Sequence, residues 1–387
     1  MMIDVDRDHE EIRDAVMRLC APFDDAYWQR LDREMAYPDA FVAALSEAGF
    51  LGALIPEEHG GSGLSLRAAT VILETIHAAG CNAAACHAQM YIMGTILRHG
   101  SAAQKVNYLP KIATGALRLQ AFGVTEPTSG TDTAALRTRA ERTADGWLVN
   151  GQKVWTSRAK QSDLMLLLAR TTPIERVQRR TDGLSTFLVD LREAVGRGVE
   201  IRPIEAMINH NTNEVFIADL HLPEDALVGE EGRGFRYILD GMNAERILIA
   251  SECIGDARWF LERASAYARE RRVFGRPIGQ NQGIQFPLAR ALAETEAAEL
   301  MVRKAAALFD AGEPCGPEAN MAKHLASEAS WHAGEAAMQT HGGYAFATDY
   351  AIERKWRETR LYQIAPVSTN LILAFLAHRV LGLPKSY

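Results

Sequence analysis

The sequence predicts an α+β fold in which helices come first, a β-domain follows and helices return. The prediction rests on changes of period: apolar residues recur every three or four positions from Asp8 to about Leu119, alternate between Arg137 and Leu222, and resume the helical period after Gly234. Such segregation argues against strands and helices alternating around a parallel sheet. We expect an N-terminal helical domain at 1–119, a β-domain at 120–228 and a C-terminal helical domain at 229–387.

The N-terminal domain is expected to consist of helices separated by turns. Ile12, Val16 and Leu19 follow one another at spacings of four and three, which places them on one face of a helix. Pro56 and the glycine-rich run at 60–63 interrupt the helical pattern and mark a turn.

The middle domain is expected to consist of strands. The runs at 137–143 and 147–155 have the period of strands, and Asp145-Gly146 between them is a dipeptide favoured in tight hairpins. Further strand-like runs lie at 164–169, 184–189 and 214–222.

The C-terminal domain is expected to consist of long helices. After Gly234 the helical period returns, with Ile247, Ile254 and Leu261 on one face of a long segment. A second long helix is expected at about 286–309, a turn at Pro314 and Gly316, and two more helices at about 320–339 and 368–381.

Composition restricts the classes of function. The chain has 387 residues, 42 Lys and Arg against 49 Asp and Glu, and a net charge of -7, which counts against nonspecific binding to nucleic acid. Hydrophobic residues make up 48%, enough for a large core in two or three domains. The five cysteines form an odd set without a CxxC pair, which fits neither a disulfide framework nor a zinc site.

The ends of the chain carry no sign of export. Asp4, Asp6 and Asp8 make the start acidic, whereas a signal peptide begins with basic residues and an apolar stretch. The most apolar run, at 371–377, is far shorter than the ~20 residues that cross a bilayer. We therefore expect a soluble, cytoplasmic protein with no membrane or nucleic-acid partner.

No dinucleotide, P-loop or zincin motif is present, so function must be inferred from other signatures. Five segments occur in a fixed order: IPEEHGGSGL at 55–64, FGVTEPTSGTD at 122–132, NGQKVWTS at 150–157, ERRVFG at 270–275 and QTHGG at 339–343. Together they resemble the acyl-CoA dehydrogenase family along essentially the whole chain. The resemblance implies an N-terminal helical domain, a middle β-domain and a C-terminal four-helix bundle, with FAD held between domains and between subunits.

The resemblance also implies which residues contact FAD. Trp155 would shield one face of the flavin and Ser157 would reach N5, although Trp155 alone would be interpreted as a core aromatic. Arg271 would cross to the partner subunit's FAD pyrophosphate, although a charge in such a run is usually solvated. The remaining cofactor contacts implied are Val124, Thr125, Gly130, Thr131, Phe274, Gln282, Gln339, Gly342, Gly343, Ser368 and Asn370.

The catalytic base implied by the resemblance is Glu245. Most members of the family carry the base near the C-terminus, where this chain has Pro366; a minority, including isovaleryl-CoA and long-chain types, carry it immediately before an arginine, here Arg246. The alternative for Glu245 is a helix-surface side chain paired with an arginine. Proline also lacks the backbone N–H that usually holds the thioester carbonyl.

Substrate contacts are implied for Thr131, Arg246 and Ala365. Ala365 replaces a bulky aromatic residue common beside the base, which would widen the acyl pocket for a branched or ring-bearing group. His87 is a further candidate for the acyl pocket, against the alternative of a satisfied or exposed helix histidine.

The leading function is an FAD-dependent acyl-CoA dehydrogenase. It would convert an acyl-CoA to a trans-2-enoyl-CoA, pass electrons to an electron-transfer flavoprotein and assemble as a homotetramer. One alternative keeps the scaffold but changes the flavin chemistry, as in desulfination or nitroalkane oxidation. Another is a flavin-binding protein without dehydrogenase turnover.

Overall fold

The computed structural model describes residues 9–385, so the acidic positions Asp4, Asp6 and Asp8 lie outside the described residues. The chain divides into two compact units, one formed by 35–64 and 84–242, the other by 1–34, 65–83 and 243–387. We call them the sheet unit and the helical unit. The domain boundaries expected after residues 119 and 228 stay a prediction.

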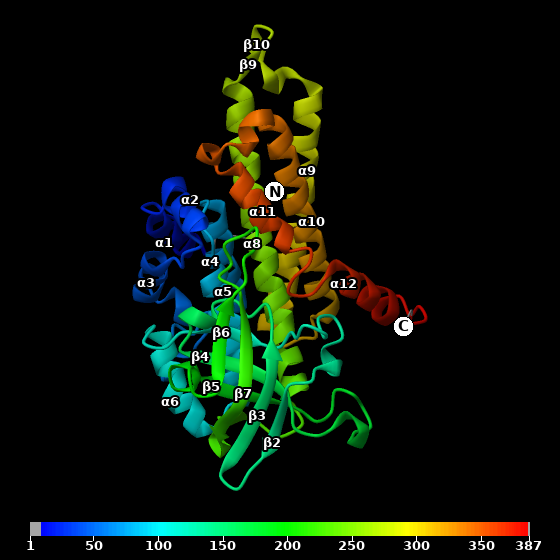
Figure 1. Ribbon diagram of the computed structural model, residues 1–387. Coiled ribbons are helices and arrows are strands. Elements are labelled where there is room, and N and C mark those ends of the chain that lie inside the picture. The colour runs from blue at the N-terminus through cyan, green and yellow to red at the C-terminus, as the bar shows by residue number, and fades with distance from the viewer. Residues whose placement is uncertain (1–8, 386–387) are drawn as a thin grey trace. The chain divides into compact units, whose positions relative to one another are not determined.

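The sheet unit contains an eight-stranded sheet (Figure 1). Its main path runs β6-β7-β3-β2-β4-β5-β8, and β1 pairs in parallel with β4. The strands are β1 (Leu119–Gly123), β2 (Arg139–Arg142), β3 (Gly146–Lys153), β4 (Leu164–Arg170), β5 (Leu184–Asp190), β6 (Val199–Pro203), β7 (Asn213–Pro223) and β8 (Leu227–Val228). The helices of the unit are α3 (Asp39–Glu47), α5 (Ala84–His99), α6 (Ala102–Ala113) and the short α7 (Leu191–Ala194).

All five expected strands are confirmed within one to three residues at their ends. The hairpin at Asp145-Gly146 is confirmed too: β2 and β3 are antiparallel, with Arg142 opposite Trp147. Three strands of the sheet unit were not expected. β1 falls where helix was expected to end and is buried without polar alternation. β6 buries only its first residue, and β8 has only two residues, too few to show a period.

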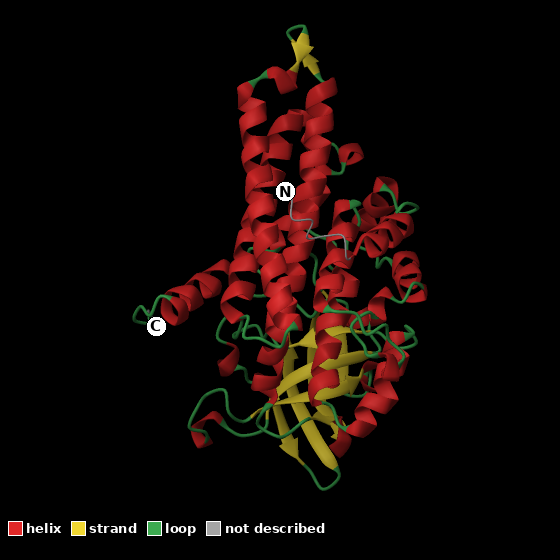
Figure 2. Cartoon of the chain, turned by 180° about the vertical axis from the view of Figure 1, so that it is seen from behind, coloured by secondary structure: helices red, strands yellow, loops and turns green. Residues whose placement is uncertain are grey.

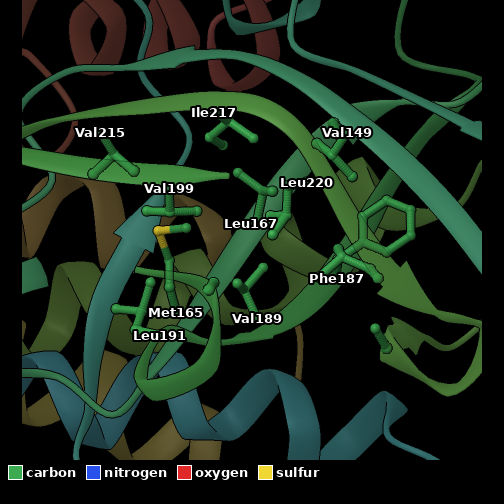
Figure 3. Packing of buried hydrophobic residues seen from close by; sticks show 14 of the residues in the cluster. Val149, Met165, Leu167, Phe187, Val189, Leu191, Val199, Val215, Ile217 and Leu220 are labelled. Atoms are coloured by element: carbon green, nitrogen blue, oxygen red, sulfur yellow. The ribbon is translucent and has the colours of Figure 1, made fainter. Parts of the chain in front are cut away.

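Strand β4 is buried at every residue, so its sequence LMLLLAR is apolar almost throughout. On one face, Met165 and Leu167 join a core with Phe187, Val189 and Val215, whose side chains point toward one another in Figure 3. On the other face, a second core contains Leu164, Leu166 and Leu188 from the sheet, and Ala88, Ile92, Met93, Ile96, Leu109 and Ile112 from α5 and α6. Helices thus cover the face that the first core leaves free.

The helical unit contains α1 (Glu10–Cys20), α2 (Asp25–Glu34), α4 (Leu66–Ala78), α9 (Gln282–Asp310), α10 (Gly316–His341), α11 (Ile352–Leu361), α12 (Thr369–Phe375) and most of α8 (Gly234–Glu270). Figure 2 shows the long helices side by side, with the hairpin of β9 (Arg272–Val273) and β10 (Arg276–Pro277) at one end. Ala257, Ala291 and Ala333 from three helices share one core, where small side chains let the helices approach closely.

The long helices and the turn before α10 are confirmed, but α11 was not expected. Its sequence IERKWRETRL is strongly polar, yet Arg354, Lys355 and Glu358 are buried in it. Because the buried face carries charges, it has no apolar period to detect. Among the described residues, no helix is both long and apolar enough to cross a membrane.

Candidate active site

Two of the five motifs meet in the sheet unit. The backbone N–H of Val154 donates to the carbonyl oxygen of Thr125 at 2.9 Å, and Nζ of Lys153 donates to the carbonyl oxygen of Val124 at 3.1 Å. The end of β3 is therefore fastened to the loop that follows β1. Motifs about 30 residues apart in sequence form one structural feature.

A buried ion pair fixes this loop. Lys153 and Glu126 are almost wholly buried, with Nζ 2.8 Å from Oε1 of the glutamate. Oε2 of Glu126 accepts the backbone N–H of Arg137 at 2.6 Å, and Oε1 accepts that of Thr138 at 2.8 Å. Burial lowers the pKa of Lys153 to about 8, although Glu126 favours its charged form. Burial also opposes ionisation of Glu126, but attraction to Lys153 and these hydrogen bonds lower its pKa below the ordinary value.

Trp155 is not the core aromatic residue that the alternative interpretation required: its side chain is 60% exposed. Its φ of +59° is in the left-handed region, which costs a residue with a side chain on the order of 1–3 kcal/mol. The next residue is held in place, because Thr156 exchanges two backbone hydrogen bonds with Asn213. The structure thus places the indole ring of Trp155 at the surface, two residues before the half-buried Ser157.

The loop on the same unit offers polar groups to a ligand. Val124 and Thr125 are half-buried, and Gly130 and Thr131 are exposed. A Cβ added to Gly130 would meet open space, so this backbone is accessible. An exposed ring next to hydroxyls and an accessible backbone suits a planar heterocycle with hydrogen-bonding edges.

The helical unit has a second candidate site, a cavity of about 620 Å³. Arg271, Gly342 and Gly343 line it, with aromatic rings from Tyr267 and Tyr344. The guanidinium of Arg271 lies 5.7 Å from the Tyr344 ring centroid, and within the described part of the chain no carboxylate pairs with it. The fourth and fifth motifs therefore converge on one cavity with a cation and two accessible glycines.

Three other expected cofactor contacts of the helical unit, Phe274, Gln282 and Gln339, do not line the cavity. Phe274 is 99% exposed at the tip of the β9–β10 hairpin, with a φ of +52°. Gln282 and Gln339 are exposed at the start of α9 and near the end of α10. All three are accessible to a ligand or a second subunit.

Glu245 is not the helix-surface glutamate of the alternative interpretation, because it is 1% exposed within α8. Its Oε2 has no hydrogen-bond partner among the described residues. Burial raises the pKa of Glu245 to about 8, opposed by Arg246 and Lys323 and supported by Glu252. A buried carboxyl group with a free oxygen and a pKa near neutrality has the properties of a general base.

The segment after α11 carries the other expected substrate contacts. Ala365 is half-buried and Pro366 exposed; the N–H of Ala365 donates to the carbonyl oxygen of Leu361 at 2.9 Å. Ser368 caps α12, since its hydroxyl accepts the N–H of Leu371 at 3.4 Å. Asn370 is exposed.

Two further candidates lie on helices. Arg246 is half-buried next to Glu245 and donates to Oδ1 of Asn243 at 3.2 Å. His87 is buried in α5 with its ring 5.1 Å from that of Tyr91, so the exposed alternative is wrong. A contact between His87 and an acyl group stays a prediction.

Sequence reasoning missed Lys323 of α10, which is fully buried. Its Nζ donates to the carbonyl oxygens of Tyr362 and, at 2.7 Å, Val367. The sequence did contain a signal for this lysine, because Lys323 lies on the buried, alanine-rich face of α10 together with Ala319, Ala322 and Ala326. A lysine at such a position needs buried partners.

Models of three acyl-CoA dehydrogenase domains match this chain in order: the N-terminal domain at 6–116, the middle domain at 121–220 and the C-terminal domain at 232–381. The chain belongs to the acyl-CoA dehydrogenase family. Members of this family are FAD-dependent flavoproteins. The fold class predicted from the sequence is thereby confirmed.

Relatives of this acyl-CoA dehydrogenase span almost the whole chain. An acyl-CoA dehydrogenase of Mycobacterium tuberculosis is 35% identical over 383 residues, 98% of this chain and 97% of the relative. A glutaryl-CoA dehydrogenase of Desulfococcus multivorans is 34% identical over 386 residues, 97% and 96%. A solved glutaryl-CoA dehydrogenase in complex with glutaryl-CoA has a TM-score of 0.91 and 31% identity, covering 100% of this chain and 98% of that one.

The residues present fit FAD. The exposed Trp155 ring, in a motif hydrogen-bonded to the loop that carries Thr125, suits the isoalloxazine. The guanidinium of Arg271, which pairs with no carboxylate among the described residues and lines a cavity with two accessible glycines, suits a diphosphate. The residues around Trp155 all lie in the sheet unit and those around Arg271 all lie in the helical unit, so each group is described within a single compact unit.

Proposed function

We propose that this acyl-CoA dehydrogenase uses Glu245 to remove a proton from the carbon α to an acyl-CoA thioester, giving a trans-2-enoyl-CoA. The observation that carries the proposal is the buried carboxyl group of Glu245, one oxygen of which has no hydrogen-bond partner within residues 9–385. This chain has Pro366 where most of the family has its base. FAD, when bound, accepts the hydride that leaves the β carbon.

The cofactor would be held by two sets of residues. Val124, Thr125, Gly130, Thr131, Trp155 and Ser157 would hold the flavin. Arg271, Phe274, Gln282, Gln339, Gly342 and Gly343 would hold the ADP portion from a partner subunit, with Ser368 and Asn370 nearby. The cavity at Arg271 and the exposed ring of Trp155 support this division.

The protein's part in catalysis is to keep the base reactive. A carboxylate of ordinary pKa is a weak base toward a carbon acid, and burial strengthens that of Glu245. Arg246 would face the CoA side or order the base. Since Pro366 has no N–H, another group must replace that contact with the thioester oxygen, a donor typically worth about 2.7 to 4 kcal/mol.

We predict that Glu245→Gln keeps FAD and binds acyl-CoA but loses flavin reduction by about 10²- to 10⁴-fold, because the amide has the same size without basicity. The measurement is anaerobic bleaching of the flavin by butyryl-, isovaleryl-, glutaryl- and cyclohexanecarbonyl-CoA. Glu262→Gln, at an exposed position of the same helix, is the matched control. Near-wild-type bleaching in Glu245→Gln would remove Glu245 from the mechanism.

A second function on the same scaffold is favoured by one observation, the missing N–H at Pro366. If no acyl-CoA bleaches the wild-type flavin, elimination chemistry such as desulfination, or oxidation of a nitroalkane, becomes the better assignment. A flavin-binding protein without turnover would respond to neither class of substrate.

Finally, we propose that the protein is a cytoplasmic homotetramer that passes electrons to an electron-transfer flavoprotein, as the resemblance implies.

A further inference from the structure

Lys323 links the segment after α11 to the middle of α10. Its Nζ donates to the carbonyl oxygen of Tyr362 and, 2.7 Å away, to that of Val367. These two carbonyl groups flank residues 363–366, which include Ala365 and Pro366. One side chain therefore holds both ends of the segment assigned to the substrate.

Burying a lysine is costly unless the ammonium group gains strong interactions. Lys323 is fully buried, and burial lowers its pKa to about 8, although Cys253 and Glu245 favour the charged form. Two carbonyl dipoles compensate only part of the desolvation of a charge. An apolar residue at this position of the alanine-rich helix could form neither of the two hydrogen bonds to the segment after α11.

The charged groups facing Glu245 show what that role is. Arg246, on the same helix as Glu245, and Lys323, on α10, favour the carboxylate form of Glu245. Glu252, which also lies on α8, disfavours it. Arg246 and Glu328 are the other charges that act on Lys323. Lys323 is fully buried on α10 and fixed there by the carbonyl groups of Tyr362 and Val367, and from this place its positive charge favours the carboxylate of Glu245.

We propose that Lys323 is a positioning residue of the dehydrogenase: it holds residues 362–367 and favours the carboxylate form of Glu245. The inference rests on the proposed function, in which Glu245 is the base. Its test must therefore measure the coupling of the two side chains without using turnover.

Stability provides that measurement. The pKa of Glu245 is raised from an ordinary value of 4.5 to about 8 in the folded state, so its protonated form favours folding fully below about pH 4.5, and this contribution is lost as the pH rises through about 8. Glutamine does not titrate. The difference in stability between the holoprotein and its Glu245→Gln counterpart should therefore level off at the folded-state pKa of Glu245.

We predict that Lys323→Met moves this levelling-off pH upward by about one unit, since a nearby positive charge lowers a carboxyl pKa by that order. Lys323→Arg keeps the positive charge, so the levelling-off pH should stay within about half a pH unit of its wild-type value. Lys304→Met removes an exposed lysine that pairs with Glu318 and should change nothing. Thermal unfolding of FAD-loaded protein between pH 5 and pH 10 gives the values.

Kinetics separates an electrostatic role from a merely structural one. With the acyl-CoA of the panel that bleaches the wild-type flavin fastest, Lys323→Met should reduce flavin about tenfold more slowly at pH 7 and recover as the pH rises, because the carboxylate fraction recovers. A structural defect would lower the rate equally at every pH. If Lys323→Met does not fold, Lys323→Gln replaces it with the same expectation.

An unchanged levelling-off pH in the folded variant, or an equal shift in Lys304→Met, overturns the proposal. If the pH shifts but no acyl-CoA reduces the wild-type flavin, the coupling stands and the dehydrogenase function fails. If flavin is reduced and the pH does not shift, the function stands and Lys323 has no electrostatic role.

Discussion

Lys153 and Glu126 show how a single pair of residues supports the candidate flavin site. The pair is buried, and every oxygen of Glu126 accepts a hydrogen bond from Lys153 or from the backbone of 137–138. Through Lys153 the pair also holds the carbonyl oxygen of Val124. Removing Lys153 would leave Glu126 as a buried charge without its counter-ion, which is more costly than removing both charges.

We predict that Lys153→Met lowers stability by about 3–5 kcal/mol and weakens FAD retention, because Glu126 becomes an unpaired buried charge. Thermal unfolding and gel filtration with flavin absorbance measure the two effects. Arg197→Met, which breaks the exposed pair with Glu193, should cost at most about 1 kcal/mol. Adding Glu126→Gln to Lys153→Met should recover part of the lost stability, because the unpaired charge is then removed. A Lys153→Met variant with wild-type stability and a full complement of FAD would contradict this account.

At the scale of elements, the β9–β10 hairpin brings side chains to the end of the helical unit. Val273 pairs with Arg276 across the hairpin, and both Phe274 and Gly275 adopt left-handed φ angles at its tip. The tight turn leaves the Phe274 side chain almost fully exposed within the part of the chain that the structure describes. An apolar ring held outward in this way is suited to contact with a ligand or a second copy.

Arg271, at the base of this hairpin, tests the cavity. We predict that Arg271→Ala weakens FAD affinity about 10- to 100-fold, the loss of a charge-assisted hydrogen bond worth roughly 1.5 to 3 kcal/mol. Equilibrium titration of the apoprotein with FAD is the measurement. Arg272→Ala is the matched control, since Arg272 bonds to the carbonyl oxygen of Gly275 and does not line the cavity. Equal affinities would return Arg271 to the solvated surface.

For the whole molecule, the central question is whether the Trp155 set and the Arg271 set act on one FAD from different subunits. The two sets lie in different compact units of the chain. In a symmetric dimer, each site would then combine the first set of one subunit with the second set of the other. Such a site can be repaired by mixing two defective subunits.

We predict that co-expressing Trp155→Ala and Arg271→Ala chains restores about a quarter of the sites, since half of the dimers are mixed and one of their two sites is intact. The readout is the fraction of sites with wild-type FAD affinity and acyl-CoA bleaching. Homogeneous preparations of each variant are the controls. No recovery in mixed oligomers would place both sets in the same subunit.

Particular residues show how far sequence alone reaches in this protein. The hairpin at Asp145-Gly146 and the long helix after Gly234 could be predicted, because turn chemistry and apolar period are local properties. Helix α11 could not, because its buried face carries Arg354 and Lys355. The motifs indicated Trp155 and Arg271 as candidates, and the family resemblance indicated Glu245. The exposure of Trp155 and the burial and raised pKa of Glu245 could not be deduced from the sequence.

Periodicity in the sequence indicated the α+β class and the order of the helical and strand regions, and motifs in a fixed order indicated the family. The three-dimensional packing was needed to show that Glu245 is buried, that Trp155 is exposed and that Lys323 holds the segment around Pro366. The physical reason is that burial and electrostatic coupling depend on neighbours from other helices. Lys323 and Glu245 are 78 positions apart in the sequence, and only packing of α10 and α8 brings their charges within reach.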